Sequence, residues 1–165
     1  MYEIGELIVY GTEGVCRVKA VGPSPFSGVP KDKLYYTLEP VYHTGVIYAP
    51  VDVKITMRKV LAKEEAWQLI NDIPNMEAER AVHGDPRQIV AEYKERIQSC
   101  DCKALLRLIR MIYAKNHDSS RGLGQIDDRF IKRAKDLLYG ELALALEIPY
   151  GEVEKTIIAA VEKSR

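Results

Sequence analysis

The chain lacks the features that mark secreted, membrane-spanning or disulfide-bonded proteins. It has only three cysteines in 165 residues, Cys16, Cys100 and Cys102. An odd number without a disulfide-framework spacing predicts reduced structural thiols. No apolar run approaches the roughly 18 residues of a membrane helix, and the first residues do not resemble a signal peptide. We therefore expect a cytoplasmic protein without a membrane partner.

The chain also lacks a recognisable set of catalytic or metal-binding residues. None of its histidines has a second ligand at metal spacing; these are His43, His83 and His117. Gly122-Leu123-Gly124 is not followed by the Lys-Ser/Thr pair of a phosphate-binding loop. The acid pairs Glu64-Glu65 and Asp127-Asp128 stand at expected helix starts, where the helix dipole accounts for them. We expect no enzyme activity, no metal and no cofactor.

Net charge is absent as well, but this balance conceals an uneven distribution. The formal charge is zero, with 24 Lys and Arg against 24 Asp and Glu. Residues 87–135 carry 12 basic against 6 acidic side chains, whereas residues 59–86 and 136–165 each carry 3 against 6. A local basic surplus is typical of a surface that meets phosphates or an acidic protein.

Within the basic block, residues 101–116 are expected to form a helix with two different faces. At about 100° per residue, the apolar side chains fall on one arc: Leu105, Leu106, Leu108, Ile109, Ile112 and Tyr113. Lys103, Arg107 and Arg110 fall on the opposite arc, and Asp101 suits the N-cap. Such a basic stripe is either a solvated helix face or a phosphate-binding surface, and the surrounding basic surplus favours the second.

Short strands are expected in the first third of the chain. An apolar run with β-branched residues covers residues 6–10, and apolar residues alternate with polar ones over residues 15–21 and 34–41. Turns and loops that contain glycine or proline separate the segments. The expected strands are residues 6–10, 15–21, 34–41, 46–49 and 54–58. Five short strands joined by tight turns predict a small antiparallel SH3-like or Tudor-like β-barrel over residues 1–60.

The hydrophobic period becomes helical after residue 61. The expected helices are residues 63–73, 85–99, 101–116, a long helix capped by Asp127 or Asp128 that ends near residue 147, and residues 152–163. Trp67, the single tryptophan, is expected in the core. The fold class is therefore α+β: the small barrel followed by a compact all-α domain of about five helices over residues 61–165.

Several segments, taken in order, resemble a known family. In the first domain they are IGELIVY (residues 4–10) with Gly14-Val15, LYYTL (34–38), IYAPVD (47–52) and MRKV (57–60). In the second they are Tyr93-Lys94, RGL (121–123) and GELALA (140–145). Together they resemble the CarD family of bacterial transcription regulators, whose first domain is shared with the RNA polymerase-interacting domain of the transcription-repair coupling factor.

The resemblance implies a monomeric adaptor associated with the bacterial nucleoid. Its barrel would dock on the β subunit of RNA polymerase by adding a strand to an exposed sheet edge. The candidate edge comprises Val46, Ile47, Tyr48, Ala49, Pro50 and Val51. The helical domain would contact promoter DNA at the upstream edge of the melted bubble and stabilise the open complex. Its candidate DNA-binding residues are Ile89, Lys94, Lys103, Arg107, Arg110, Lys132 and Lys135.

One departure from the family pattern leaves alternatives open. The family usually inserts a Trp into the distorted minor groove at the position that Ile89 occupies here. Ala91 and Glu92 stand where relatives carry a basic pair, and Asp128 stands where basic residues are common. Ile89 either acts as a weak wedge or is buried. The alternative function is a polymerase-docking adaptor whose helical domain binds another protein rather than DNA.

A third class is a Tudor-like barrel that reads another peptide or an RNA. Its aromatic side chains would come from Tyr35, Tyr36, Tyr42 and Tyr48.

Overall fold

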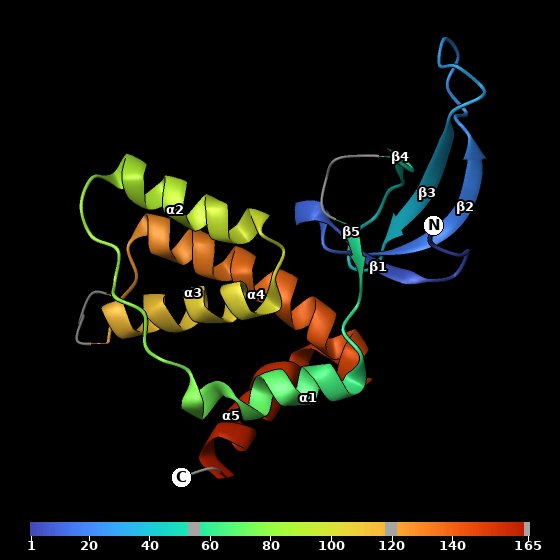
Figure 1. Ribbon diagram of the computed structural model, residues 1–165. Coiled ribbons are helices and arrows are strands. Elements are labelled where there is room, and N and C mark those ends of the chain that lie inside the picture. The colour runs from blue at the N-terminus through green and yellow to red at the C-terminus, as the bar shows by residue number, and fades with distance from the viewer. Residues whose placement is uncertain (53–56, 118–121, 164–165) are drawn as a thin grey trace. The chain divides into compact units, whose positions relative to one another are not determined.

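The computed structural model of the chain describes residues 1–52, 57–117 and 122–163 (Figure 1). The chain divides into two compact units, Met1–Val60 and Leu61–Arg165. The first unit is an antiparallel sheet and the second is a set of five α-helices. The predicted α+β architecture is confirmed.

The sheet contains β1 (Leu7–Tyr10), β2 (Val15–Pro23), β3 (Leu34–Pro40), β4 (Ile47–Pro50) and β5 (Met57–Lys59). The strand order is β4-β3-β2-β1-β5, and the pairings are antiparallel. Of the expected fifth strand, residues 54–56 lie outside the described residues. The predicted turn after β1 is the 3₁₀ helix η1 (Gly11–Glu13), where Gly11 and Gly14 take the positive φ angles that favour glycine.

The core of the sheet unit consists of side chains from the inner face of β1 to β4. Its buried members are Ile8, Tyr10, Cys16, Val18, Tyr36, Leu38 and Ala49. Cys16 is a buried free thiol, and burial raises its pKa to about 11. Such a thiol is unreactive, which fits its expected structural role.

The helical unit contains α1 (Lys63–Asn71), α2 (Pro86–Gln98), α3 (Cys102–Lys115), α4 (Gln125–Leu146) and α5 (Val153–Lys163). Short 3₁₀ helices, η2 (Ile73–Asn75) and η3 (Tyr150–Glu152), follow α1 and α4. α3 packs on α2 and α4, while α1 packs on α4 and α5. No helix among the described residues has an apolar stretch long enough to span a bilayer.

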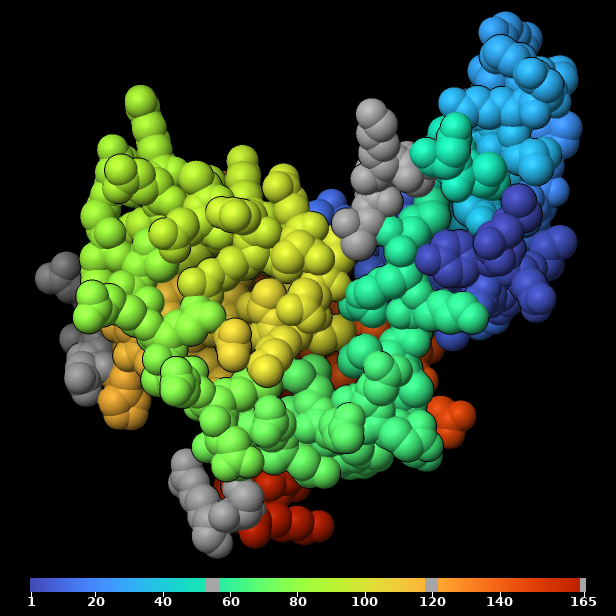
Figure 2. Space-filling view, in the orientation of Figure 1, coloured from blue at the N-terminus to red at the C-terminus, as the bar shows by residue number. Residues whose placement is uncertain are grey.

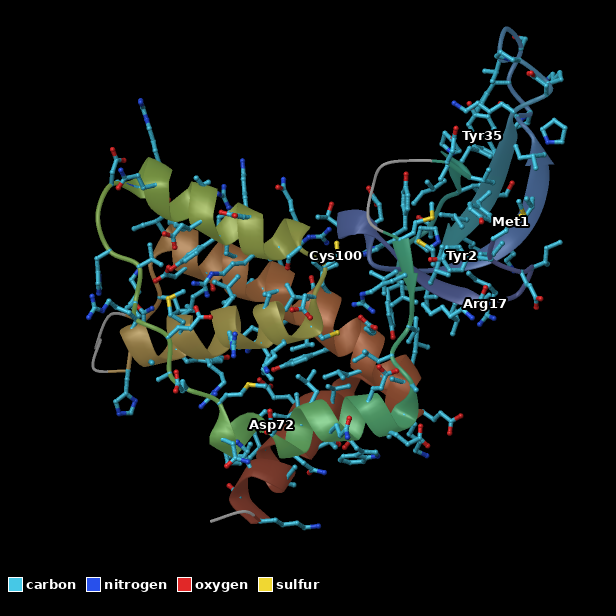
Figure 3. The ribbon with its side chains drawn as sticks, in the orientation of Figure 1. Met1, Tyr2, Arg17, Tyr35, Asp72 and Cys100 are labelled. Atoms are coloured by element: carbon cyan, nitrogen blue, oxygen red, sulfur yellow. The ribbon has the colours of Figure 1, made fainter. Side chains whose placement is uncertain are left out.

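Two of the predicted helix starts are confirmed by their capping bonds. The Asp85 side chain accepts the Arg87 N–H at 2.9 Å, and the Asp101 side chain accepts the Lys103 N–H at 3.3 Å. Cys100 lies between these helices, in the turn from α2 to α3, and adopts a positive φ of 55° (Figure 3). The short turn makes α2 and α3 neighbours in the unit.

Two sequence-based expectations about the helical unit are wrong. Neither Asp127 nor Asp128 caps α4, because the helix begins earlier, with Gly124 at the N-cap, and Asp127 lies buried in the first turn. Trp67 is not a core residue, since it is 37% exposed on the outer side of α1. The inner side of this short helix is filled by Ala66 and Ile70 instead.

Asp127 is the centre of a buried polar network that joins three helices. Its Oδ1 accepts a hydrogen bond from the Tyr93 hydroxyl of α2 at 2.8 Å, and its Oδ2 accepts one from Asn116 Nδ2 at 2.9 Å. Lys115 Nζ lies 3.4 Å from Oδ2. Burial opposes ionisation of Asp127, but the bonds from Asn116 and Tyr93 and the Lys115 charge outweigh it and lower its pKa.

A second buried carboxylate fixes the start of the helical unit. Glu141 Oε2 accepts the Leu61 N–H at 2.9 Å, and Oε1 accepts the Cys102 thiol at 3.1 Å. Both oxygens of this buried side chain therefore have donors, one at the first residue of the unit and one on α3. Removing either donor would leave a buried acceptor unsatisfied.

Asp127→Asn should reduce stability and change its dependence on pH. A carboxylate whose pKa is lowered by folding stabilises the protein above its unfolded pKa of about 4, and this contribution is lost as the pH falls through the lower folded value. We expect a loss of about 1–3 kcal/mol at pH 7 and a flatter stability profile in acid, measured by urea unfolding followed through helical circular dichroism. The control Asp128→Asn, at a more exposed ion pair, should cost no more than about 1 kcal/mol. Equal acid dependence in Asp127→Asn and the unmodified protein would contradict this role.

Candidate functional site

β4 stands at one end of the strand order, and among the described residues it pairs only with β3. The register places Ile47 opposite Leu38, Tyr48 opposite Thr37 and Ala49 opposite Tyr36. Just past the strand, the Val51 N–H donates to the Leu34 carbonyl at 3.1 Å. This bond fixes which residues of β4 direct their backbone groups toward β3.

Hydrogen-bonded and non-bonded pairs alternate along an antiparallel ladder. Since Val51 bonds to the residue opposite it, Ile47 and Ala49 also direct N–H and C=O toward β3. The N–H and C=O of Tyr48 therefore point away from β3, toward the outer edge. Pro50 shares this direction but has no N–H, so it offers only an acceptor.

The side chains of β4 alternate in the same way. Ala49 is fully buried, and Ile47 packs on the core. Val46 is 52% exposed and Tyr48 is 37% exposed. The Phe26 ring packs edge-on against the Tyr48 ring, with a centroid distance of 5.1 Å and an interplanar angle of 85°. The outer side of β4 is thus an apolar surface next to an outward-facing backbone.

The four tyrosines considered for peptide or RNA reading do not share a surface. Tyr36 is buried in the core, where its hydroxyl accepts the Tyr2 N–H at 3.0 Å and its ring contacts the Tyr2 ring. Tyr36 pairs with the buried Ala49, so it lies on the core face of the sheet. Tyr48 is the neighbour of Ala49 in the strand and therefore lies on the outer face. This arrangement does not form an aromatic cage from the four side chains.

α3 carries Lys103, Arg107 and Arg110 on one narrow strip, which we call the cationic strip. Lys103 is exposed, whereas Arg107 and Arg110 are half-buried. Leu106 and Met111, which border the strip, are buried. Tyr113 departs from its predicted place on the apolar arc, since it is 47% exposed. Among the described residues, the three cations of the strip have no ion-pair partner.

Acidic side chains nevertheless surround the cationic strip. Lys103 lines a cleft of about 600 Å³ together with Glu65, Asp72 and Asp101; Asp72 stands at the end of α1 (Figure 3). The segment between η2 and α2 is also acidic where it passes α3. Its residues Glu77 and Glu79 line a small pocket of about 80 Å³ with Arg107 and Arg110.

The remaining candidate cations are distributed over α2 and α4. Lys94 is exposed on α2, near the exposed acids Glu92 and Glu95 of the same helix. On α4, Lys132 Nζ lies 2.9 Å from Asp128 Oδ2. Lys135 Nζ lies 3.3 Å from Glu154 Oε1 and also donates to the Tyr113 hydroxyl.

The pairing of Lys132 and Lys135 affects what they can bind. Burial disfavours the charge of Lys135, but Tyr113 and Glu154 outweigh it and raise its pKa. A phosphate would have to displace an existing acidic partner at Lys132 or Lys135. Lys94 and the cationic strip have no such partner among the described residues.

Ile89 is half-buried near the start of α2. It lies one helical turn before Tyr93, which is fully buried and packs against Phe130 at a ring distance of 5.4 Å. Ile89 is therefore at the border of the core, with part of its side chain accessible. No group of three or more potential metal ligands occurs in the described part of the chain.

We call the segment between η2 and α2, residues 76–85, the acidic connector. From the sequence we expect no element between residues 73 and 85, and this connector opposite the cationic strip was not identified. Glu79 forms an ion pair with Arg96 of α2, and Met76 is buried. The only sequence signal was the acidic surplus of residues 59–86 beside the basic block. A coil has no periodicity from which such contacts could be read.

Two family models match the chain. The CarD-like/TRCF RID domain matches residues 2–61. This range covers the sheet unit from its second residue and includes Leu61, the first residue of the helical unit. The CarD, C-terminal domain matches residues 77–158, from the acidic connector into α5. α1, with the exposed Trp67, lies between the two matched regions.

Proposed function

The chain belongs to the CarD family of non-enzymatic transcription regulators, whose RID domain binds RNA polymerase, and on this premise we propose how each unit works. The sheet unit binds the β subunit of RNA polymerase through the outer edge of β4. The helical unit contacts promoter DNA at the upstream edge of the bubble and stabilises the open complex. The protein acts where the polymerase acts, on the bacterial nucleoid.

The backbone of β4 is the observation that carries the polymerase part of the proposal. Strand addition needs an edge whose N–H and C=O groups point outward. Tyr48 meets this requirement, and the exposed side chains of Val46 and Tyr48 add an apolar contact. Because Pro50 cannot donate, an added strand would receive its hydrogen bond from Tyr48 rather than from Pro50.

The DNA part of the proposal is supported by the cationic strip and by Lys94. These side chains have the character of non-specific phosphate contacts, which give affinity that falls steeply with salt. Ile89 would offer a partly accessible apolar side chain to a distorted base step, the kind of insertion that architectural proteins use. Specificity would then come from promoter position and DNA deformability.

One observation favours the alternative, in which the helical unit binds a protein. An apolar groove of about 830 Å³ lies between η2, α3, α4 and α5. Its lining includes Leu106, Ile109 and Ile158, and the last of these is largely exposed. Arg110 on one side and Glu162 on the other would suit a peptide that carries both charges.

Tyr48→Glu should weaken binding to the polymerase β subunit by at least about tenfold, because a charge on the outer face of an edge strand opposes strand addition. The measurement is the dissociation constant for an isolated β-subunit lobe. Tyr42→Glu is the matched control, since Tyr42 is similarly exposed but lies outside β4. Binding of Tyr48→Glu that equals that of the unmodified protein would refute the β4 interface.

Arg107→Glu combined with Arg110→Glu should weaken binding to forked promoter DNA by about tenfold or more at low salt, and should reduce the salt slope by about one to two. The control is Lys155→Glu with Lys163→Glu, which changes the net charge equally on α5. Filter binding at several salt concentrations gives both quantities. If the two double variants bind DNA equally well, the cationic strip is not the contact surface. Failure of the unmodified protein to bind forked promoter DNA at low salt, beside intact polymerase binding, would select the protein-binding alternative.

A further inference from the structure

The connector between η2 and α2 passes over the C-terminal half of α3. Figure 1 shows it crossing in front of α3 on its way to α2, and Figure 2 shows its atoms on this face of the helical unit. It has no helix or strand between Asn75 and Pro86. Its two ends are fixed, because Met76 is buried and Asp85 caps α2.

The connector is anchored at a third point by charge. Glu79 forms an ion pair with Arg96, which lies near the end of α2. This pair holds Glu79 to α2, and Glu79 also lines a pocket with Arg107 and Arg110 of α3. Glu77 is exposed two residues earlier.

Glu77 and Glu79 line a small pocket together with two residues of the cationic strip. The pocket of about 80 Å³ is lined by these two acids and by Arg107 and Arg110. The charges share its walls without forming an ion pair among the described residues. Opposite charges that line one small pocket attract each other across it.

Arg107 has an unused hydrogen-bond donor at this position. Its Nε is buried, and it has no hydrogen-bond partner in the part of the chain that the structure describes. A buried donor without an acceptor is unfavourable. The covered arrangement therefore leaves Arg107 incompletely satisfied, and a phosphate oxygen would supply the missing acceptor.

The connector has a glycine at its end, just before the cap of α2. Gly84 adopts a φ of +124°, which side chains other than hydrogen rarely allow, and it directly precedes the Asp85 cap. The connector therefore joins α2 through a residue that can change conformation without steric cost. Movement of residues 77–83 need not disturb the start of α2.

We propose that residues 77–83, which carry Glu77 and Glu79 against the single base Arg80, form an acidic strap that covers Arg107 and Arg110 and competes with nucleic-acid phosphates for them. This inference rests on the proposed DNA contact by the cationic strip. Binding of DNA exchanges the glutamates for phosphates, and the strap moves away from α3. The strap keeps the affinity for arbitrary DNA low, so that stable contact requires the protein to be held at a promoter by the polymerase.

The strap contact is tested first without DNA, on the full-length protein. Arg107→Gln with Arg110→Gln should increase the amide hydrogen-exchange rates of residues 77–84 by about threefold or more, because the attraction that holds the strap is removed. Lys155→Gln with Lys163→Gln is the control and should leave these rates unchanged. Unchanged strap exchange in the arginine variant would overturn the strap, whatever the protein's affinity for DNA.

The second test measures binding to forked promoter DNA by fluorescence anisotropy. Glu77→Gln with Glu79→Gln should tighten binding by about three- to tenfold, against about twofold for the control Glu3→Gln with Glu13→Gln, which changes the net charge equally at exposed positions of the sheet unit. The difference should disappear when Arg107→Glu and Arg110→Glu are also present, because the strap then has nothing to cover. Equal tightening by the two glutamate pairs would overturn the strap.

Two further outcomes separate the strap from the proposed function. If the arginine variants release the strap but no variant binds DNA, the strap contact stands and the proposed DNA function fails. If DNA binding depends on Arg107 and Arg110 but not on the glutamates, the proposed function stands and the strap fails. If loss of the Glu79–Arg96 pair unfolds the protein, the single variant Glu77→Gln is used instead. It should tighten DNA binding more than the control Glu3→Gln does. Equal tightening by these two single variants would contradict the strap.

Discussion

The helical unit depends on the enclosure of α3 by its neighbours. Most of its side chains outside the cationic strip are buried, with Tyr113 an exposed exception, and the Asp127 network fixes its C-terminal end to α2 and α4. At the other end, Glu141 accepts the Cys102 thiol and so joins α3 to α4. With both ends fixed by buried carboxylates, Lys103, Arg107 and Arg110 can face only one direction. Any role in binding anions follows from this constraint.

Local signals in the sequence were sufficient for most elements. Alternation located β2 and β3, and an apolar run with β-branched residues located β1. The caps at Asp85 and Asp101 follow from short-range chemistry that any helix start shows. The errors arose where tertiary contacts decide. Asp127 resembled a cap because its partners Tyr93 and Asn116 are distant in the sequence, and Trp67 proved exposed because periodicity cannot show which neighbours cover a helix.

In the candidate site, too, some features could be predicted from the sequence and others only from the structure. The β4 segment was identified through its family resemblance, whereas the outward direction of the Tyr48 backbone follows only from the register and the Val51–Leu34 bond. The cationic strip was predicted by helical spacing, but its acidic cover was not, since Glu77 and Glu79 lie in a coil. The zero net charge acquires a physical meaning here, because acids stand directly beside the cations that they balance.

The central claim is that one chain joins the polymerase to promoter DNA through two separate surfaces. The lifetime of the open complex on a single promoter, measured with and without the protein at two salt concentrations, tests this claim most directly. We predict a longer lifetime with the unmodified protein, a smaller gain at higher salt, and no gain when either the β4 edge or the cationic strip is altered. An unchanged lifetime at both salt concentrations, with polymerase binding intact, would contradict the account.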